Sequence, residues 1–267
     1  MVGWGVLPLH PLGGDAELSR RKLRLGANVS LLYPDRPLTQ RIAAARADGF
    51  DAVEILFPYA EDVRALRDAL RAAEMPLALI NTPAGDWAAG ERGFAAVPGA
   101  EARFREGFGA ALTWARALGA EVVHVMAGLA EGRAARTTFV DNLRWAVAEA
   151  GAQRLTIEPI NADDMPGYFL GDFALACDLL DEVGAPTLGL QFDAYHAARI
   201  TGDVAGTWAE VGHRVFHVQV AGVEDRHEPD DQGAFLDLLE AQGFMGVVSG
   251  EYHPRGRTGD GLGWMDR

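Results

Sequence analysis

The chain has 267 residues, 49% of them apolar, and is long enough to bury one large core or two small ones. Its formal net charge of −14, from 38 acidic and 24 basic residues, argues against nucleic acid as a partner, because nucleic-acid binding needs a strongly basic surface. No apolar run reaches the roughly 18 residues of a membrane span, and Cys177, the only cysteine, excludes an intrachain disulfide and fits a reduced, cytoplasmic setting.

The N-terminal residues differ in character from the rest of the chain. A Gly- and Pro-rich start precedes a basic cluster, which reverses the order of a signal peptide. We therefore expect residues 1–22 to form a loose extension and residues 23–267 to form a single domain. Lys22 is the only lysine. Schiff-base chemistry, pyridoxal phosphate and a Walker-type phosphate loop all need a lysine, so the sequence comes close to excluding them.

Eight short apolar runs of β type follow one another along the chain, each leading into a helix-length segment or a loop. Near-continuous apolar runs are typical of parallel strands covered on both faces. Regular alternation with helical segments predicts an α/β protein, and eight repeats favour a closed (β/α)₈ TIM barrel over an open sheet. No Gly-x-Gly-x-x-Gly follows a run, which weakens a dinucleotide-binding alternative. The predicted strands cover residues 23–30, 52–57, 77–81, 121–126, 154–159, 188–193, 215–220 and 247–251; clear helical segments cover 38–48, 63–73, 101–118 and 139–150.

One connection, residues 82–100, is much longer than the others. A loop of this length inside a compact domain is usually functional or disordered. This one contains Trp87 and Phe94, and such large aromatic residues argue against disorder. We predict that it forms a lid.

Each of the last four predicted strands ends near a side chain with a ligand oxygen: Glu158, Asp193, Gln219 and Glu251. Burying a carboxylate is costly unless something pairs with it, and the active face of such a barrel lies at the carboxyl ends of its strands. For any one of these residues alone, a simpler interpretation than a metal ligand is a polar residue at the start of a loop. Four on consecutive strands predict one metal site, and this oxygen set suits Mg²⁺ or Mn²⁺ better than zinc or copper.

Each histidine near these strand ends could belong either to the site or to the core. His196 follows the second of the carboxylates by three residues and is predicted to contact substrate at the same mouth. Period-two alternation puts His217 on the same side of its strand as Gln219, either beside the site or in the core. His227 stands in a polar loop and could bind an anion. His124 is read as a core residue.

Anion recognition requires arginine at the mouth, since the planar guanidinium matches a carboxylate. Arg92, in the long loop, and Arg226, after the seventh strand, are the candidates. Arg255 and Arg257 are weaker candidates of the same type.

Several segments together resemble the hydroxypyruvate isomerase family, within the xylose isomerase-like TIM barrels, over nearly the whole chain. The loop around Trp87 and the Met-Pro-Gly-Tyr-Phe run are specific to that group, whereas the Glu and Asp strand ends occur more widely, including in ketose 3-epimerases. The matching segments are ANVSLL (27–32), FDAVE (50–54), GDWAAGERG (85–93), IEPIN (157–161), DMPGYF (164–169), QFDAYH (191–196), RHEP (226–229) and GLGW (261–264).

The resemblance implies roles for the residues singled out above. The four strand-end residues hold one divalent cation, and Glu158 and Glu251 also act as the acid/base pair. His196 matches a substrate-contacting histidine of the related epimerases. Substrate contacts are further assigned to Glu91, Arg92, Arg226 and His227.

Two departures from the family pattern stand out. About four residues are missing after Pro229, which would reshape the seventh loop. The sequence also ends where a final helix is expected, so an eighth helix would be missing or shortened, with the N-terminal extension as a partial substitute.

The expected reaction is the interconversion of hydroxypyruvate and tartronate semialdehyde through an enediolate, in which a divalent cation polarises the carbonyl and two glutamates move the proton. A 2-oxo-tetronate isomerase or a ketose 3-epimerase is the alternative. A non-catalytic sugar-acid binding barrel and a metal-dependent endonuclease are weaker rivals. The expected partner is a small 2-oxo or hydroxy acid or a sugar, with neither nucleic acid nor membrane, and a homo-oligomer stays open.

Overall fold

The structure is a computed structural model that describes residues 23–266. The predicted loose extension, residues 1–22, lies outside the described residues, so its boundary stays a prediction. Within residues 23–266, no helix combines the length and apolar character that a membrane crossing needs.

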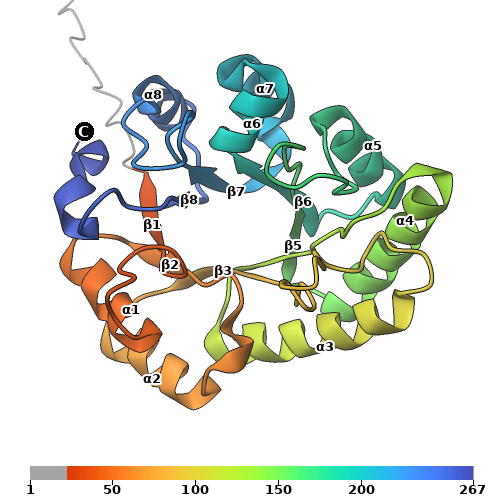
Figure 1. Cartoon of the computed structure of the whole chain (residues 1–267), viewed down its shortest axis with the longest axis horizontal. Helices are drawn as coiled ribbons and strands as arrows, with labels where there is room; N and C mark the ends of the chain where they lie inside the picture. Colours follow the sequence, from red (N-terminus) through yellow and green to blue (C-terminus); the bar gives the residue numbers. More distant parts are fainter. Residues whose placement is uncertain (1–22, 267) are drawn as a thin grey trace, which may run out of the picture.

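Eight parallel strands close into a barrel in sequence order, with β1 paired to both β2 and β8 (Figure 1). This confirms the predicted (β/α)₈ barrel. The strands are buried because helices cover the outside of the barrel. Their buried residues include an apolar core and also polar side chains such as Asn28, Glu54 and His217. The strands are β1 Arg24–Asn28, β2 Ala52–Glu54, β3 Leu77–Asn81, β4 Val122–His124, β5 Arg154–Ile157, β6 Leu188–Asp193, β7 Val215–Val220 and β8 Val247–Gly250.

The helices alternate with the strands, except that two helices follow β6. Helix α3 shows why these segments are helical, since its buried residues recur at helical spacing and face the sheet. Asp62 and Asp172 cap the N-termini of α2 and α5 by accepting backbone N–H bonds. The helices are α1 Leu38–Ala47, α2 Val63–Ala72, α3 Glu101–Leu118, α4 Gly132–Ala150, α5 Phe173–Val183, α6 Ala194–Thr201, α7 Val204–Val211 and α8 Gly233–Ala241.

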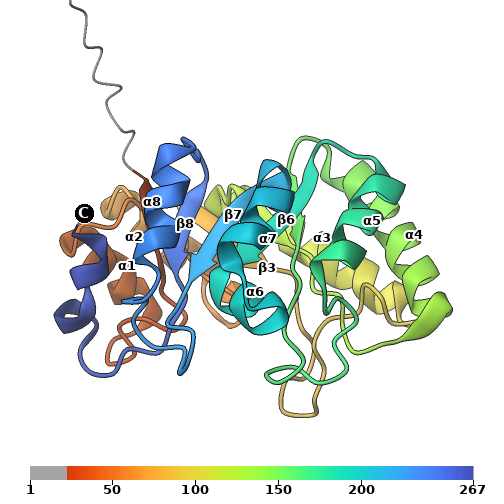
Figure 2. The ribbon, with the colours of Figure 1, turned by 90° about the horizontal axis from the view of Figure 1, so that it is seen from above.

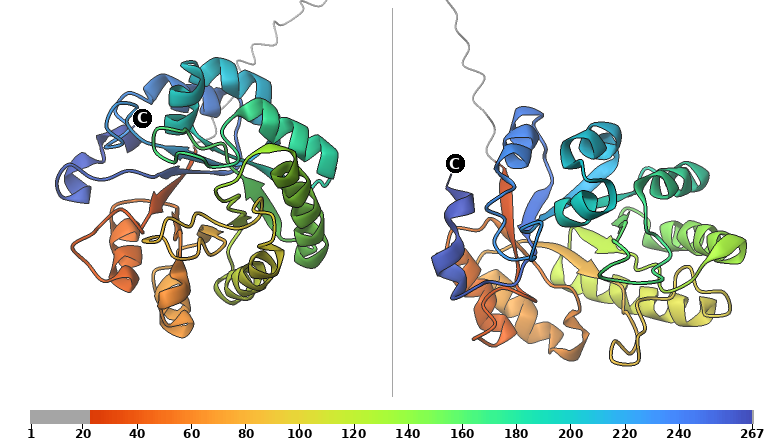
Figure 3. Two further views of the ribbon diagram at one scale, coloured as in Figure 1. Left: turned by 45° about the vertical axis from the view of Figure 1, so that its right-hand side comes forward. Right: turned by 45° about the horizontal axis from the view of Figure 1, so that its top comes forward.

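No α-helix follows β8 in the part of the chain that the structure describes. Two short 3₁₀ helices, η3 Thr258–Gly261 and η4 Gly263–Met265, take its place beside α1 (Figure 3). Trp264 is buried there, with its ring 6.2 Å from Phe50 and 6.3 Å from Tyr252. The expected absence of a regular eighth helix is thus confirmed for these residues, and an indole ring covers part of the opening.

The loops after β3 and β5 extend from the same end of the barrel (Figure 2). The long loop, residues 82–100, is anchored at its far end by the Ala96 N–H, which donates to the Ala127 carbonyl at 2.7 Å. At its tip Trp87 is 48% exposed, and the Arg92 guanidinium lies 3.8 Å from the centre of its ring. The loop therefore reaches the barrel mouth, where Trp87 lines the cavity, and its role as a lid stays a prediction.

Candidate active site

A cavity of about 230 Å³ opens at the carboxyl ends of the strands. This volume lies below the range of roughly 300–1,000 Å³ for sites that take drug-sized ligands, which favours a substrate of only a few carbons. Its wall combines apolar side chains with two glutamates, one aspartate, three histidines and one arginine. The lining residues include Leu31, Phe57, Asn81, Trp87, His124, Met126, Glu158, Asp164, Met165, His196, Arg226, Glu251 and His253.

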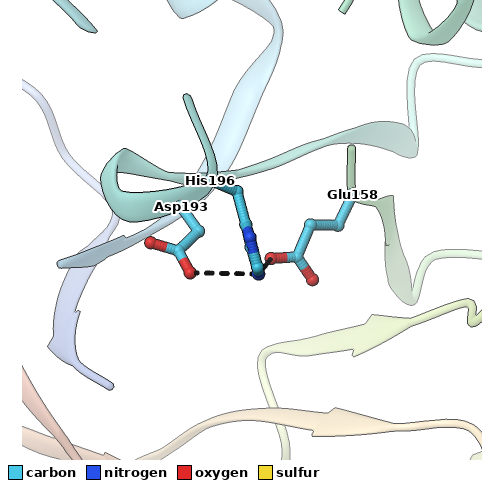
Figure 4. Close-up of side chains that lie close together, drawn as sticks. All are labelled: Glu158, Asp193 and His196. Carbon is cyan, nitrogen blue, oxygen red and sulfur yellow. Dashed lines mark ion pairs between the residues drawn. The ribbon is translucent and has the colours of Figure 1, made fainter. Parts of the chain in front are cut away.

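Three buried side chains come together on one side of this cavity (Figure 4). Glu158 follows β5, Asp193 ends β6, and His196 lies in the first turn of α6. Their ligand atoms all lie within 4.8 Å of one another. Asp193 holds its place because its Oδ1 accepts the Tyr195 N–H at 2.9 Å, capping α6. Two carboxylates thus face the mouth from neighbouring strands, as the sequence predicted.

Glu251 and Gln219 approach the same region from the other side. Gln219 is opposite Asp193 in the β6–β7 register, and Glu251 directly follows β8. The Arg226 guanidinium joins the two sides, with Nη2 at 2.9 Å from Glu251 Oε2 and 3.4 Å from Asp193 Oδ2. The structure therefore brings Glu158, Asp193 and Glu251 to one end of the barrel, with Gln219 paired to Asp193 on the neighbouring strand; that these four hold one metal stays a prediction.

Burial and mutual repulsion disfavour the charged forms of these carboxylates. Burial, followed by the charges of Glu251 and Asp193, raises the pKa of Glu158 well above its ordinary value. Burial likewise raises the pKa of Asp193 to about 6 and that of Glu251 to about 8, although the Arg226 charge opposes both shifts. Without a cation, the protein therefore does not stabilise all three carboxylates in their charged forms.

A divalent cation fits these residues. Glu54, Glu158, Asp193 and Glu251 are all buried, and within residues 23–266 Arg226 is the only arginine in an ion pair with any of them. Hard oxygen ligands and excess negative charge are what Mg²⁺ or Mn²⁺ requires.

His196 presents an N–H to the cavity. The Asn161 side-chain Oδ1 accepts the backbone N–H groups of Asp163 and Asp164, so its Nδ2 must face His196 Nδ1, at 2.7 Å. Nδ1 is then a hydrogen-bond acceptor and the proton of the neutral ring sits on Nε2, 3.6 Å from Asp193 Oδ2. Burial lowers the pKa of His196 well below its ordinary value, which keeps the ring neutral. This arrangement suits a substrate donor and not a metal ligand, which needs a free lone pair.

His124 lies in the cavity wall rather than in the apolar core. Its Nδ1 is 3.2 Å from Asn81 Oδ1 and 3.8 Å from Glu158 Oε2, while the buried Nε2 has no hydrogen-bond partner among the described residues. Burial lowers the pKa of His124 to about 3. The sequence reading of His124 as a core residue accounts for its burial but not for this contact with the cavity.

Arg226 sits at the mouth on an unusual backbone. Its φ of 54° is left-handed, and its carbonyl accepts the His253 N–H at 3.0 Å. The guanidinium lies 4.9 Å from the centre of the Tyr195 ring, and Nη1 is 3.4 Å from Asp164 Oδ2. Ion pairs on three sides direct the arginine into the cavity, where the sequence placed an anion-binding group.

Three other predicted substrate contacts lie outside the residues that line the cavity. Glu91 pairs with Arg103 at 2.7 Å and accepts the Asp86 N–H, so its carboxylate shapes the long loop. The Arg92 guanidinium stacks on Trp87 and reaches substrate only through that ring. His227 Nδ1 contacts the His253 carbonyl. A substrate role for Glu91, Arg92 and His227 stays a prediction.

Glu54 is a residue of this site that the sequence analysis did not single out. It ends β2, is fully buried, and contacts Asn28, His217 and Gln219. The predicted run continued to Phe57, whereas β2 ends at Glu54, so the sequence did not show that this carboxylate stands at a strand end. Gln191 and Asn161 were missed as well, because an uncharged amide inside a strand, as at Gln191, or in a loop, as at Asn161, carries no distinctive sequence signal.

Known proteins are similar to this chain in sequence and in fold. The family described as xylose isomerase-like TIM barrel matches residues 42–267. A 2-oxo-tetronate isomerase from Cupriavidus necator is 44% identical over 252 residues, covering 91% of this chain and 97% of that protein. A hydroxypyruvate isomerase from Escherichia coli is 37% identical over 254 residues, covering 91% and 98% of the two chains.

Several solved structures have a fold similar to that of this chain. A crystal structure named as an AP endonuclease of family 2 from Brucella melitensis has a TM-score of 0.88 at 38% identity, covering 91% of this chain and 98% of that one. A D-allulose 3-epimerase from Methylomonas sp. shares the fold, with a TM-score of 0.71 at 21% identity over 86% and 85% of the two chains. The chain therefore belongs to the xylose isomerase-like TIM barrel family, in its hydroxypyruvate isomerase group of isomerases.

Proposed function

We propose that this protein interconverts a short 2-oxo-3-hydroxy acid and its carbonyl-shifted isomer, with hydroxypyruvate and tartronate semialdehyde as the first candidate pair. The observation that supports it most is that two buried glutamates, Glu158 and Glu251, face one small cavity with raised pKa values. A carboxyl group whose pKa is shifted toward neutral pH is suited to accept and return a proton.

Glu158, Asp193, Gln219 and Glu251 are proposed to hold one Mg²⁺ or Mn²⁺. When bound, the cation would polarise the substrate carbonyl and stabilise the negative charge of an enediolate. The carboxylates of Glu158, Asp193 and Glu251 are buried close to one another, so the positive charge of the cation would offset their mutual repulsion.

Side chains of the protein transfer the proton and bind the substrate. One of Glu158 and Glu251 removes the proton from the hydroxyl-bearing carbon, and the other delivers a proton to the neighbouring carbon. His196 donates its Nε2–H to a substrate oxygen, an orientation supported by its Asn161 contact. Arg226 is directed into the cavity and binds the substrate carboxylate through its planar fork.

A four-carbon 2-oxo acid is the second candidate, because the relative at 44% identity is named a 2-oxo-tetronate isomerase. The deciding experiment is a substrate panel of hydroxypyruvate, four-carbon 2-oxo acids and ketohexoses, each with Mg²⁺ and with Mn²⁺. Turnover of a three- or four-carbon acid supports the proposal. Turnover of ketohexoses alone would make the protein an epimerase, and binding without solvent-deuterium exchange would make it a binding protein.

An endonuclease activity is not proposed, although one similar structure carries that name. The formal net charge of −14 opposes a DNA duplex, and the cavity is small. Cleavage of DNA with an abasic site under the same metal conditions would reverse this view. We also propose the reduced cytoplasmic setting that a single cysteine suggests.

A further inference from the structure

Glu54 lies beneath the candidate metal site as a fully buried carboxylate. Its Oε1 accepts from Asn28 Nδ2 at 2.7 Å and from Gln219 Nε2 at 2.8 Å. Its Oε2 lies 2.6 Å from His217 Nε2. An ionised carboxylate only accepts hydrogen bonds, so each neighbour must turn a donor toward it.

The amide of Asn28 confirms this direction independently. Its Oδ1 accepts the Ser30 N–H at 3.0 Å, so its Nδ2 has to face Glu54. The same Nδ2 lies 3.1 Å from Oε1 of Glu251, so Asn28 links Glu54 to a proposed metal ligand.

Gln219 is the next member of a directed chain of amides. With its Nε2 on Glu54, its Oε1 is left to face Gln191 Nε2, at 2.8 Å. Gln191 Nε2 also donates to Glu158 Oε2 at 2.8 Å, and its own Oε1 is buried without a partner among the described residues. When the carboxyl groups at both ends are ionised, they fix this direction, because reversing either amide would place its oxygen against a carboxylate oxygen.

We propose that Glu54 is a positioning residue that fixes Gln219 as an oxygen donor to the divalent cation and, through Asn28, holds Glu251 in place. This rests on the proposed function, in which Gln219 is a ligand. An amide oxygen has two lone pairs, so Gln219 Oε1 can accept from Gln191 and still bind a cation. The Nε2 group could not, because it has no free lone pair.

The test measures Mn²⁺ binding by calorimetry in wild type, in Glu54→Gln and in the swapped pair Glu54→Gln/Gln219→Glu. In Glu54→Gln the amide at 219 can turn either way, and the Mn²⁺ dissociation constant should rise about 10- to 100-fold, as for other residues that orient ligands. The swapped pair keeps the total charge and supplies an oxygen at 219 in either orientation, so it should return close to the wild-type value.

The outcomes separate the two proposals. Wild-type protein that fails to bind Mn²⁺ would defeat the proposed function itself. Wild-type binding with unchanged binding in Glu54→Gln, or a folded swapped pair that fails to recover, would overturn the role of Glu54. Thermal unfolding in chelator identifies a variant that does not fold. If Glu54→Gln does not fold, the double variant Glu54→Gln/Gln219→Glu provides the test. Mn²⁺ binding by the double variant supports the proposal, and loss of Mn²⁺ binding contradicts the proposal.

Discussion

The side-chain amide of Asn161 donates to Nδ1 of His196 at 2.7 Å, and this contact determines which nitrogen of the ring carries the proton. Both hydrogen-bonding ends of the amide are in use, because its oxygen accepts two backbone N–H groups of the following turn. A change of a single atom type at residue 161 should therefore change the chemistry of His196 while leaving the turn in place.

Asn161→Asp provides that change. The new carboxylate can still cap the turn but can only accept from Nδ1, so the proton moves to Nδ1 and Nε2 loses its N–H. We expect kcat to fall about 10²-fold, the scale of losing one positioned proton donor. Nitrogen NMR of the imidazole reports the tautomer directly, and an unchanged tautomer would contradict the argument.

Glu158→Gln and Glu251→Gln should each abolish exchange of the substrate proton with solvent. Each change keeps the shape of the side chain but removes the group that accepts and returns the proton, and a loss of about 10²- to 10⁴-fold is expected. Deuterium incorporation into substrate in heavy water measures it. Near-normal incorporation in both variants would remove the acid/base assignment.

Arg226→Lys should impair carboxylate-bearing substrates selectively. Lysine keeps the positive charge but loses the planar fork that can hold a carboxylate while contacting Asp193 and Glu251. We expect KM for hydroxypyruvate to rise about tenfold or more, since hydrogen bonds to charged groups contribute about 1.5–3 kcal/mol. A neutral hydroxyketone, to the extent that it is turned over, is the matched control, and an equal loss for both substrates would argue against carboxylate recognition.

The metal-free protein should lose stability as the pH rises above about 6.5. Folding raises the pKa of Glu251 to about 8, so the folded protein holds a proton that the unfolded chain has released, and the free energy of unfolding falls until the pH passes that value. Starting near pH 6.5 limits the opposing effect of His124 and His196, whose pKa values folding lowers.

Urea unfolding in chelator across this range measures the slope. Glu251→Gln should flatten it, and saturating Mn²⁺ should reverse it, because cation binding displaces protons from its ligands. A slope that is the same in wild type and in Glu251→Gln would show that this carboxyl group does not titrate as described.

Gly250→Ala should destabilise the fold by about 1–3 kcal/mol, the usual cost of overpacking. An added Cβ would lie 2.8 Å from Tyr252 Cε1 and 3.0 Å from Trp264 Cζ2. Gly263→Ala is the matched control, since a Cβ there meets nothing within 4 Å. Chemical denaturation compares the two, and equal stability of both variants would mean that the rings move aside without cost.

The sequence predicted the strands well and the site in part. Strands β3, β6 and β7 have the predicted bounds, because the apolar runs there are of strand length and are bounded by turn residues. Helix α4 begins at Gly132 rather than near Phe139, since its first two turns are largely exposed and lack apolar periodicity. The four strand-end oxygen residues were found because they repeat once per βα unit.

What the sequence could not supply is the direction of the hydrogen bonds. Whether Gln219 offers oxygen or nitrogen depends on Glu54, which precedes it by most of the chain and meets it only when the barrel closes. The proton position on His196 likewise depends on a turn around Asn161. Such properties come from three-dimensional neighbours and have no local signature.

Strands β1 and β8 close the barrel next to the two short 3₁₀ helices η3 and η4. The two strands pair along four register positions, and within residues 23–266 no α-helix follows β8. Glu251 directly follows β8 and Asn28 ends β1, and the Asn28 Nδ2 group donates to Glu251 Oε1 across this pair of strands. The β1–β8 pairing therefore holds one proposed ligand next to the amide that orients it, so a substitution that separates these two strands should also disturb the catalytic mouth.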